Sequence, residues 1–455
     1  MDTQYAIRYT FLYFQAYFKP FSPDIVDFST AFGILRSMQN FLHGRLMVVR
    51  LSLLAAVCLL LVVGIVVIYA VGHPADSSGG GQSAGLGGLW KKQILFAIVG
   101  LLGFIVVNLI DYRKAGALSY WFYAGILVLL GLLLLDKFVA LSIGGFASIP
   151  VRNGTRRWIE FSVGPKSVSI QPSEFCKLAY IVALAWYLRY RSNYRRFRGL
   201  IGPFVLTLLP MVMIMLEPDL GTVLLMMPVL FVMLFAAGAK VKHLAIIILL
   251  ALLVSPVMWV KMNPYQRIRI SSVLLQNKWV QKKAQEHPAV GKILVGKQFD
   301  VKQWKNDWGY HLIRSKYAVT SGGLSGYGYR KGPFVKYNFL PARHNDFIFA
   351  TIGHQWGFLG CVGILVVFTI IVLCGLEIGV NNTDPFARLV AIGIVAMISV
   401  EVLVNVGMAV GIMPITGLNL PFVSYGGSSL LVHMIAIGLL NNIGRHRPFS
   451  VAGRC

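Results

Sequence analysis

The chain has 455 residues, of which 56% are apolar and only 13% are charged, and its mean hydropathy is +0.69. Soluble globular domains have about 25% charged residues, so the composition excludes an ordinary soluble chain and predicts a membrane protein. The formal net charge is +25. In a membrane protein this charge suits phosphate-bearing lipid headgroups, and we expect no nucleic-acid partner.

Ten apolar runs are long enough to cross a hydrocarbon core, which takes roughly 17 to 25 helical residues. They lie at about 51–72, 94–111, 117–135, 174–190, 200–216, 220–237, 243–260, 346–377, 387–412 and 427–444. They predict an all-α polytopic membrane protein of about ten transmembrane helices, with a large extracytoplasmic loop at 261–345 between helices 7 and 8. We expect an aromatic-rich interfacial segment at 1–49, a transmembrane domain at 50–445 and a tail at 446–455.

Lysine and arginine gather after the fourth run, at 189–198, and the positive-inside bias predicts that this side is cytoplasmic. Both termini then lie in the cytoplasm, and 136–173, 261–345 and 413–426 lie outside. The loop at 261–345 goes against the bias, because it has 16 Lys and Arg against three acids. It is either a solvated loop that is translocated despite its charge, or a surface for a polyanionic ligand.

Ionisable groups are costly in lipid, so polar residues beside apolar runs are informative. In the segment 153–181, Glu174 and Lys177 have the i,i+3 spacing that lets them pair. Such a pair either locks helix packing or lines a polar cavity. In EPDLGT at 217–222, Glu217 and Asp219 flank a proline, and a tight turn with a helix cap is the leading interpretation.

Two further stretches combine polar residues with apolar surroundings. In FLPARHNDFIFATIG at 339–353, Asp346 stands directly against the apolar run that follows. In GIMPITGLNLPFVSYGGSSLL at 411–431, prolines and glycines interrupt the apolar pattern. Non-helical backbone at membrane depth is tolerated only where protein buries it or a cavity borders it. Alone, this stretch would suit a re-entrant loop of a channel or transporter.

Together these stretches resemble the SEDS family, the shape, elongation, division and sporulation proteins typified by RodA and FtsW. The words NG-RRW, QPSEF-KL, PDLGT, SGGL-G-G, FLP-RH-DFIFA and P-TG--LPFVSYGGSS occur in the family's order over roughly 50–445. Members are inner-membrane glycosyltransferases that polymerise lipid II into peptidoglycan strands, usually with a class B penicillin-binding protein as transpeptidase. The resemblance implies this activity, with lipid II and the lipid-linked glycan strand as substrates.

The wording SGGLSGYGYRKG followed by FLPARH is more similar to the RodA branch than to FtsW. It implies cell elongation and rod shape, with elongation-complex proteins as partners. A septal role of the FtsW type stays open.

The resemblance implies that Asp346 is the catalytic carboxylate. It also implies a set of substrate-binding residues: Arg156, Arg157, Glu174, Lys177, Ser424, Gly426 and Gly427. To these we add Arg343, because a planar guanidinium suits phosphate oxygens. We add the neighbouring His344 as a weaker candidate, because a histidine at an interface is more often packed or solvated than reactive.

The sequence departs from the family's pattern near these residues. The family's PERHTDF is PARHNDF here, so Ala342 and Asn345 replace a glutamate and a threonine. His354 and Gln355 replace two glutamates, and Glu401 replaces a glutamine of the ninth helix. The changes leave Asp346 intact and put in doubt any metal or proton-relay role of the missing glutamates.

Making a glycosidic bond from a lipid diphosphate requires an acceptor hydroxyl to lose its proton while diphosphate leaves with negative charge. A carboxylate placed where a loop enters a helix lies at the height of the lipid headgroups. A divalent cation could neutralise the diphosphate, but no ligand cluster in the sequence demands a metal. Two alternatives remain at this point: a lipid II flippase or other transporter, and a scaffold that only recruits a transpeptidase.

Overall fold

The computed structural model describes residues 46–74, 86–139, 147–151, 155–163, 166–190, 197–296, 298–337, 339–340 and 342–445. The chain divides into two units, Met1–Val48 and Val49–Cys455, and the helical bundle and its site belong to the second. Most of the predicted segment 1–49 and all of the predicted tail 446–455 lie outside the described residues.

Ten long helices in the described part of the chain correspond to the ten predicted runs. They are α3 (Leu46–Gly72), α4 (Leu89–Leu109), α6 (Ser119–Val139), α7 (Pro172–Leu188), α8 (Ile201–Leu216), α9 (Leu220–Ala237), α10 (Val241–Lys261), α17 (Ile348–Val380), α18 (Pro385–Ala409) and α19 (Gly427–Arg445). Nine are long and apolar enough to span a bilayer. The tenth, α7, has 17 residues, the lower limit for a crossing. The protein is therefore an all-α polytopic membrane protein.

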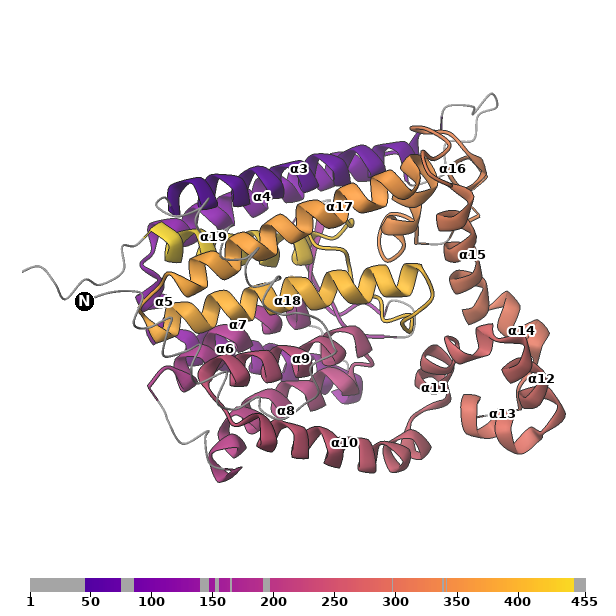
Figure 1. Cartoon of the computed structure of the whole chain (residues 1–455), viewed down its shortest axis with the longest axis horizontal. Helices are drawn as coiled ribbons and strands as arrows, with labels where there is room; N and C mark the ends of the chain where they lie inside the picture. Colours follow the sequence, from indigo (N-terminus) through magenta and orange to yellow (C-terminus); the bar gives the residue numbers. More distant parts are fainter. Residues whose placement is uncertain are drawn as a thin grey trace, which may run out of the picture. The chain divides into compact units, whose positions relative to one another are not determined.

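The helices differ in how much protein surrounds them. In the most apolar window of α18 and of α19, 72% and 78% of the residues are buried, whereas in α10 only 6% are. A helix that is apolar all round and barely packed on protein must be solvated by lipid. Accordingly, α18 and α19 form the centre of the bundle and α10 lies at its edge (Figure 1).

The segment between α10 and α17 is helical rather than an open loop. It contains α11 (Pro264–Ser271), η3 (Leu274–Gln276), α12 (Lys278–Glu286), α13 (Pro288–Val295), α14 (Val301–Asn306), α15 (Trp308–Ser321) and α16 (Pro333–Lys336). These elements gather at one end of the bundle (Figure 1). Two short elements, α5 (Tyr112–Ala117) and η2 (Phe197–Leu200), lie in the other connections.

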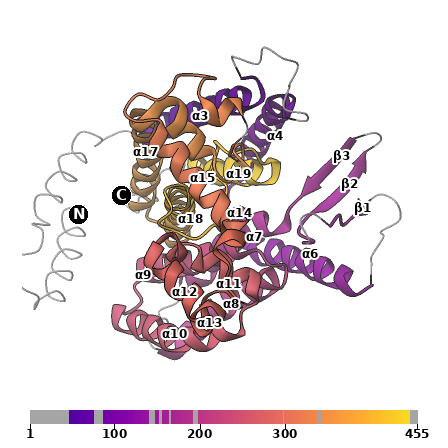
Figure 2. The same ribbon diagram turned by 90° about the vertical axis from the view of Figure 1, so that its right-hand side faces the viewer.

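A small antiparallel sheet precedes α7, and no alternating pattern in the sequence indicated it. Its strands are β1 (Ala147–Ser148), β2 (Ile159–Val163) and β3 (Lys166–Ile170), in the order β1-β2-β3. Phe161 of β2 is opposite Ala147 on one side and Val168 on the other. Figure 2 shows the sheet at the edge of the molecule. The segment 155–158, directly before β2, contains Arg157, whose charge acts on Asp346.

Helix α17 is broken at Gly357, whose φ of 65° and ψ of −159° are not helical. The glycine-rich segment 322–328 satisfies the freed backbone groups: Phe358 N donates to Gly323 O at 2.8 Å, and Gly328 N donates to Gln355 O at 2.9 Å. A Cβ at Gly357 would lie 2.5 Å from Gly326 N. The SGGL-G-G word is therefore the backbone partner of the break in α17, a cause of helix kinking that needs no proline.

Candidate active site

Asp346 lies just before α17, and a hydrogen bond to its backbone carbonyl holds it in place. Asn405 of α18 donates from Nδ2 to Asp346 O at 3.0 Å and to Leu418 O at 2.7 Å. The N-cap of α17 is Phe347, with no side-chain capping bond. The Asp346 carboxylate thus does not serve as the helix cap that would explain an acid at this position without chemistry.

The interrupted stretch 411–426 packs against the residues that precede α17. The Ser424 hydroxyl donates to Asn345 O at 2.8 Å and accepts from Leu420 N at 2.8 Å. Tyr425 N donates to His344 O at 2.9 Å. The structure therefore brings the FLP-RH-DF and SYGG motifs together, and the hydrogen bond from Ser424 to Asn345 O is one of the links between them.

The two glycines of SYGG allow close approach of neighbouring side chains. A Cβ at Gly426 would lie 3.0 Å from Asn419 Nδ2, and one at Gly427 would lie 3.0 Å from the ring of Phe96 in α4. Gly427 is also the first residue of α19. Their role in the described structure is to fit the stretch between its neighbours.

Two arginines and one acid set the electrostatics of Asp346. Burial raises the pKa of its carboxyl to about 6, and the charge of Asp219 adds to the rise, while Arg269 and Arg157 oppose it. A Cβ at Gly417, where φ is +79°, would meet Arg269 Nη2 at 3.6 Å and Asp346 Oδ2 at 3.7 Å. The Arg269 guanidinium and the Asp346 carboxylate therefore both lie next to the backbone of Gly417.

The EPDLGT turn positions Arg157. Arg157 Nε donates to Glu217 O at 2.9 Å, and its Nη2 donates to Pro218 O. Burial, with a contribution from Asp219, raises the pKa of the Glu217 carboxyl to about 8, although Arg157 opposes the rise. Glu217 is thus mostly protonated at neutral pH and leaves the charge of Arg157 available to an anion.

Asp219 is a helix cap, which confirms the turn-and-cap interpretation. Its carboxylate accepts from Thr222 N at 3.4 Å and from Thr222 Oγ1 at 3.0 Å at the start of α9. It also accepts from Ser173 Oγ at 3.0 Å, in the first turn of α7. One carboxylate therefore ties the starts of α7 and α9 together beside Asp346.

Lys177 belongs to a separate buried network. Its Nζ lies 2.7 Å from Glu174 Oε2 and 2.7 Å from Glu401 Oε1, so the predicted i,i+3 pair with Glu174 is present. Glu401 Oε2 lies 2.5 Å from His433 Nε2. The Lys177 side chain is only 1% exposed and two carboxylates hold its ammonium, so we leave it out of the proposed diphosphate-binding set.

Two other predicted residues, Arg156 and Arg343, have protein partners. Arg156 pairs with Asp136 at the end of α6 at 2.6 Å and keeps 34% of its side chain exposed. Buried Arg343 donates to the carbonyls of Val335 at 2.9 Å and Val71 at 3.0 Å. Arg343 therefore joins the end of α3 to the segment before α17, which is a positioning role.

His344 lies edge-on to the ring of Tyr425, with centroids 5.8 Å apart. Burial and the charge of Arg343 lower the pKa of its imidazole. A neutral imidazole at pH 7 suits a packed side chain at the site better than a second cation for phosphate.

An apolar cavity of about 340 Å³ has Arg269 in its lining. It lies between α8, α9 and α11, and its lining includes Met211, Met215, Leu224 and Met227, with Arg269 as the one charged residue. Because Arg269 also borders Gly417 beside Asp346, the cavity and the carboxylate share this guanidinium. The arrangement suits a ligand with an apolar tail and an anionic head.

The described residues contain no group of three or more His, Cys, Asp or Glu side chains placed to hold a metal ion. Arginine charges surround Asp346, and Asp219 is occupied as a cap. Mg²⁺ is often held by one or two carboxylates together with substrate phosphates, and a bound diphosphate would supply such phosphate ligands. No step of the proposed reaction depends on a metal ion.

Sequence reasoning missed Arg269, Asn405 and Gly417. Arg269 is one of 16 cations in the segment 261–345, and nothing in its neighbours distinguishes it. Asn405 and Gly417 become informative only once α18 and the stretch 411–426 are known to meet Asp346.

The model of the FtsW, RodA and SpoVE family of cell cycle proteins matches residues 50–448. The chain belongs to this family. It is 35% identical over 361 residues to stage V sporulation protein E of Bacillus subtilis, covering 79% of this chain and 87% of that protein. It is 33% identical over 404 residues to the peptidoglycan glycosyltransferase RodA of Treponema pallidum, covering 78% of this chain and 89% of that protein.

The fold is similar to a chain in a solved structure described as a peptidoglycan synthase complex that coordinates polymerization and crosslinking. The TM-score is 0.63 at 28% identity, covering 86% of this chain and 96% of the other. With relatives named peptidoglycan glycosyltransferase at this identity and coverage, this member of the FtsW, RodA and SpoVE family is a peptidoglycan glycosyltransferase. The SEDS resemblance inferred from the motifs is confirmed.

Proposed function

We propose that the protein polymerises lipid II into glycan strands, with Asp346 as the general base. The observation that carries the proposal is the carboxylate of Asp346 beside Arg269 and Arg157, where Arg269 also lines an apolar cavity. A transporter site needs no such base at the border between loop and helix. A site that joins two lipid-linked sugars needs a base, an anion-stabilising group and space for a lipid tail.

In the proposed step, the acceptor hydroxyl gives its proton to the Asp346 carboxylate as its oxygen attacks the anomeric carbon of the donor. The bond from that carbon to the diphosphate oxygen breaks, and the bonding electrons leave with the lipid diphosphate. Arg269 and Arg157 stabilise the charge that develops on the leaving group. Attack opposite the leaving group inverts the anomeric centre.

The pKa of about 6 for Asp346 supports this role. At pH 7 most of the carboxyl is ionised and can accept a proton. Its affinity for that proton is nevertheless higher than that of an ordinary aspartate, which favours general base catalysis near neutral pH.

The cavity between α8, α9 and α11 accommodates the first part of one lipid tail. Its lining is almost wholly apolar, and Arg269 meets the phosphate at the point where tail and head join. Burial of the tail holds the sugar at the height of Asp346, because the lipid cannot leave the headgroup plane.

We further propose that the protein lies in the cytoplasmic membrane with both termini in the cytoplasm and Asp346 at the outer face, as the distribution of Lys and Arg predicts. The RodA-like wording around 321–344 supports a role in elongation and rod shape, with a septal role as the second candidate. A class B penicillin-binding protein is the proposed transpeptidase partner, supported by the likeness to a synthase complex that couples polymerization to crosslinking.

The proposal is tested with purified protein in detergent and fluorescently labelled lipid II. We expect a ladder of glycan polymer on a gel, which a hydrolase specific for the glycan strand removes. Translocation of the labelled headgroup across vesicles without any polymer would instead support the flippase. Polymer formed equally by wild type and by an Arg269→Gln/Asp346→Asn variant would show that this site is not the reacting one.

A further inference from the structure

Helices α11 to α14 form a compact subdomain, of which the proposed reaction uses only α11, through Arg269 and the cavity lining. Buried side chains from across 268–304 make its core: Ile268, Leu275, Ala284, Val295, Phe299 and Trp304. Trp304 donates from Nε1 to Ser272 Oγ at 3.1 Å inside this core. The lysine-rich stretch of the sequence therefore folds around its own apolar centre instead of extending as a solvated loop.

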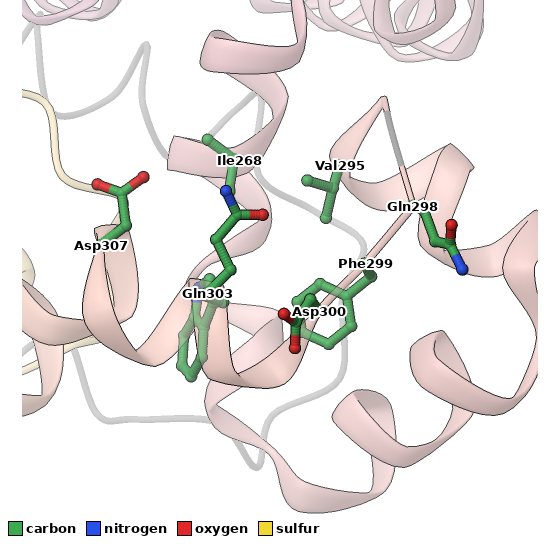
Figure 3. Close-up of a pocket in the computed structure, with 8 residues that line it drawn as sticks. Ile268, Val295, Gln298, Phe299, Asp300, Gln303 and Asp307 are labelled. Carbon is green, nitrogen blue, oxygen red and sulfur yellow. The ribbon is translucent and has the colours of Figure 1, made fainter.

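The subdomain does not bind a small ligand through its pocket. Figure 3 shows this pocket, between Ile268, Phe299, Asp300 and Asp307. Its volume is about 10 Å³, which is room for roughly one water molecule. A further role of α12 to α14 is therefore sought on their surface.

One hydrogen bond fixes the height of this surface relative to the bilayer. Trp259 lies in the last turn of α10, the helix with the least protein around it. Its Nε1 donates to Ile293 O of α13 at 2.7 Å. Tryptophan at the end of a spanning helix lies at the headgroup level, so α13 lies there as well.

The exposed side chains of α12 and α13 include large apolar residues and lysines. Trp279 is 62% exposed and Ile293 is 60% exposed, and Lys283 Nζ lies 4.1 Å from the centre of the Trp279 ring. On α12, the helical spacing puts Lys278, Lys282 and Lys283 on the same face as Trp279, opposite buried Ala284. Glu286 shares this face and lies 3.7 Å from Lys282, which leaves a net charge of +2 on it. A helix with Trp and Lys on its exposed face is typical of a membrane interface.

The charge indicates which lipids this face suits. The segment 274–307 has seven lysines against three acids, and Lys261 ends α10 nearby. The apolar surface continues along α10, where Val257 and Val260 are exposed as in a lipid-solvated helix. An acidic protein would complement the lysines, but it would leave exposed Ile293 beside the lipid-facing surface of α10 without a partner.

We propose that the face formed by Lys278, Trp279, Lys282, Lys283 and Ile293 docks on the anionic phospholipid headgroups of the adjoining leaflet. Ile293 and Trp279 enter the headgroup layer, and the three lysines pair with lipid phosphates. The docked subdomain holds α11, and with it Arg269, over the bundle. The inference rests on the chain being a membrane protein and is independent of the glycosyltransferase proposal.

The test uses the full chain in vesicles, with a spin label on Ile293→Cys in a background whose other cysteines are replaced and whose melting curve matches the parent. The collision rates of the label with oxygen and with a water-soluble nickel complex report its depth. A label on Asn306→Cys serves as the control, since α14 lies farther from α10 than α13 does in both views (Figures 1 and 2). We expect the label at 293 to be oxygen-accessible in vesicles containing phosphatidylglycerol, and the label at 306 to remain in water.

A second comparison isolates the lysines. Each lysine near an anionic surface contributes about fivefold to binding. Lys278→Gln/Lys282→Gln/Lys283→Gln should therefore weaken docking by up to roughly a hundredfold and need more phosphatidylglycerol to give the same depth at 293, whereas Lys302→Gln/Lys305→Gln on α14 should not. The inference is overturned if the label at 293 is in water in these vesicles. It is equally overturned if its depth is the same in vesicles of phosphatidylcholine alone, or if the label leaves water only after an acidic partner protein is added.

Discussion

The proposed chemistry depends on the carboxylate of Asp346. Asp346→Asn keeps the shape of the side chain but removes the proton acceptor, and general bases typically contribute 10²–10⁴-fold. We expect polymer yield to fall by about that factor, while lipid II still binds. The melting temperature should not fall, because the variant removes a charge that burial disfavours.

The control for this variant is Asp300→Asn. Asp300 is an exposed N-cap of α14, with its side chain accepting from Lys302 N, and Asn caps a helix as well as Asp does. The control should keep full activity. If Asp346→Asn were as active as Asp300→Asn, then Asp346 would be no base.

The pH dependence of the reaction follows from two carboxyls near the site. The pKa of Asp346 is raised to about 6, so protonation should lower the rate progressively below pH 6. The pKa of Glu217 is raised to about 8, so above pH 8 a new negative charge beside Arg157 should weaken diphosphate binding. We therefore expect a bell-shaped profile in steady-state polymerisation assays.

The variant Glu217→Gln separates the two limbs of this profile. It should abolish the alkaline fall and leave the acid fall near pH 6 unchanged. Melting curves at each pH exclude unfolding as the cause. A flat profile between pH 5 and 7 in folded protein would contradict the assignment of Asp346.

At the scale of elements, a charged network joins three helices inside the bundle. Glu174 and Lys177 come from α7, Glu401 from α18 and His433 from α19. His433 Nδ1 faces Ser429 O at 2.6 Å and Nε2 faces Glu401 at 2.5 Å. An imidazolium satisfies both acceptors, and it makes the formal charge of the network zero. Neutrality is the state that a low-dielectric interior favours.

A double-mutant cycle tests this network. Breaking a buried pair by removing one partner costs roughly 3–5 kcal/mol, so Glu401→Gln and His433→Gln should each lower the melting temperature strongly. The double variant should lose less than the sum, with a coupling of roughly 0.5–3 kcal/mol. The exposed pair Lys282 and Glu286, 3.7 Å apart, is the matched control and should couple by less than about 1 kcal/mol. Equal coupling energies in the two cycles would show that Glu401 and His433 do not form a buried ion pair.

The break in α17 gives a second prediction at this scale. Gly357 has φ 65° and no space for a Cβ, so Gly357→Ala forces strain of about 1–3 kcal/mol and a backbone clash. Gly363 lies on the same helix, and a Cβ added there would have no neighbour within 4 Å. Gly363→Ala should be neutral or stabilising by up to about 1 kcal/mol. Thermal unfolding of the two variants side by side decides whether the break is required.

At the scale of the whole molecule, the topology can be tested on cells. The proposed orientation puts the subdomain of α11 to α14 outside and the connection between α7 and α8 inside. A cysteine at exposed Lys305 should react with a membrane-impermeant maleimide on intact cells. A cysteine at exposed Tyr190 should react only after the membrane is permeabilised. The reverse pattern would place Asp346 in the cytoplasm and exclude polymerisation at the outer face.

The membrane class, the ten long helices and the position of Asp346 at the start of α17 were all predictable from sequence alone. These features are local, because lipid as a solvent demands an unbroken apolar run at each crossing. The pairing of Glu174 with Lys177 was predictable for the same reason, since one helix turn sets their distance.

Which polar groups meet depends on how the helices pack, and no local pattern predicted it. Arg269 reaches Asp346 from another segment, and Glu401 and His433 meet across two helices although 32 positions separate them. Lys177 and Arg343, expected at the diphosphate, have protein partners instead. A buried polar group must find its partner wherever the packing of the whole chain provides one, and a pattern along the chain does not record that choice.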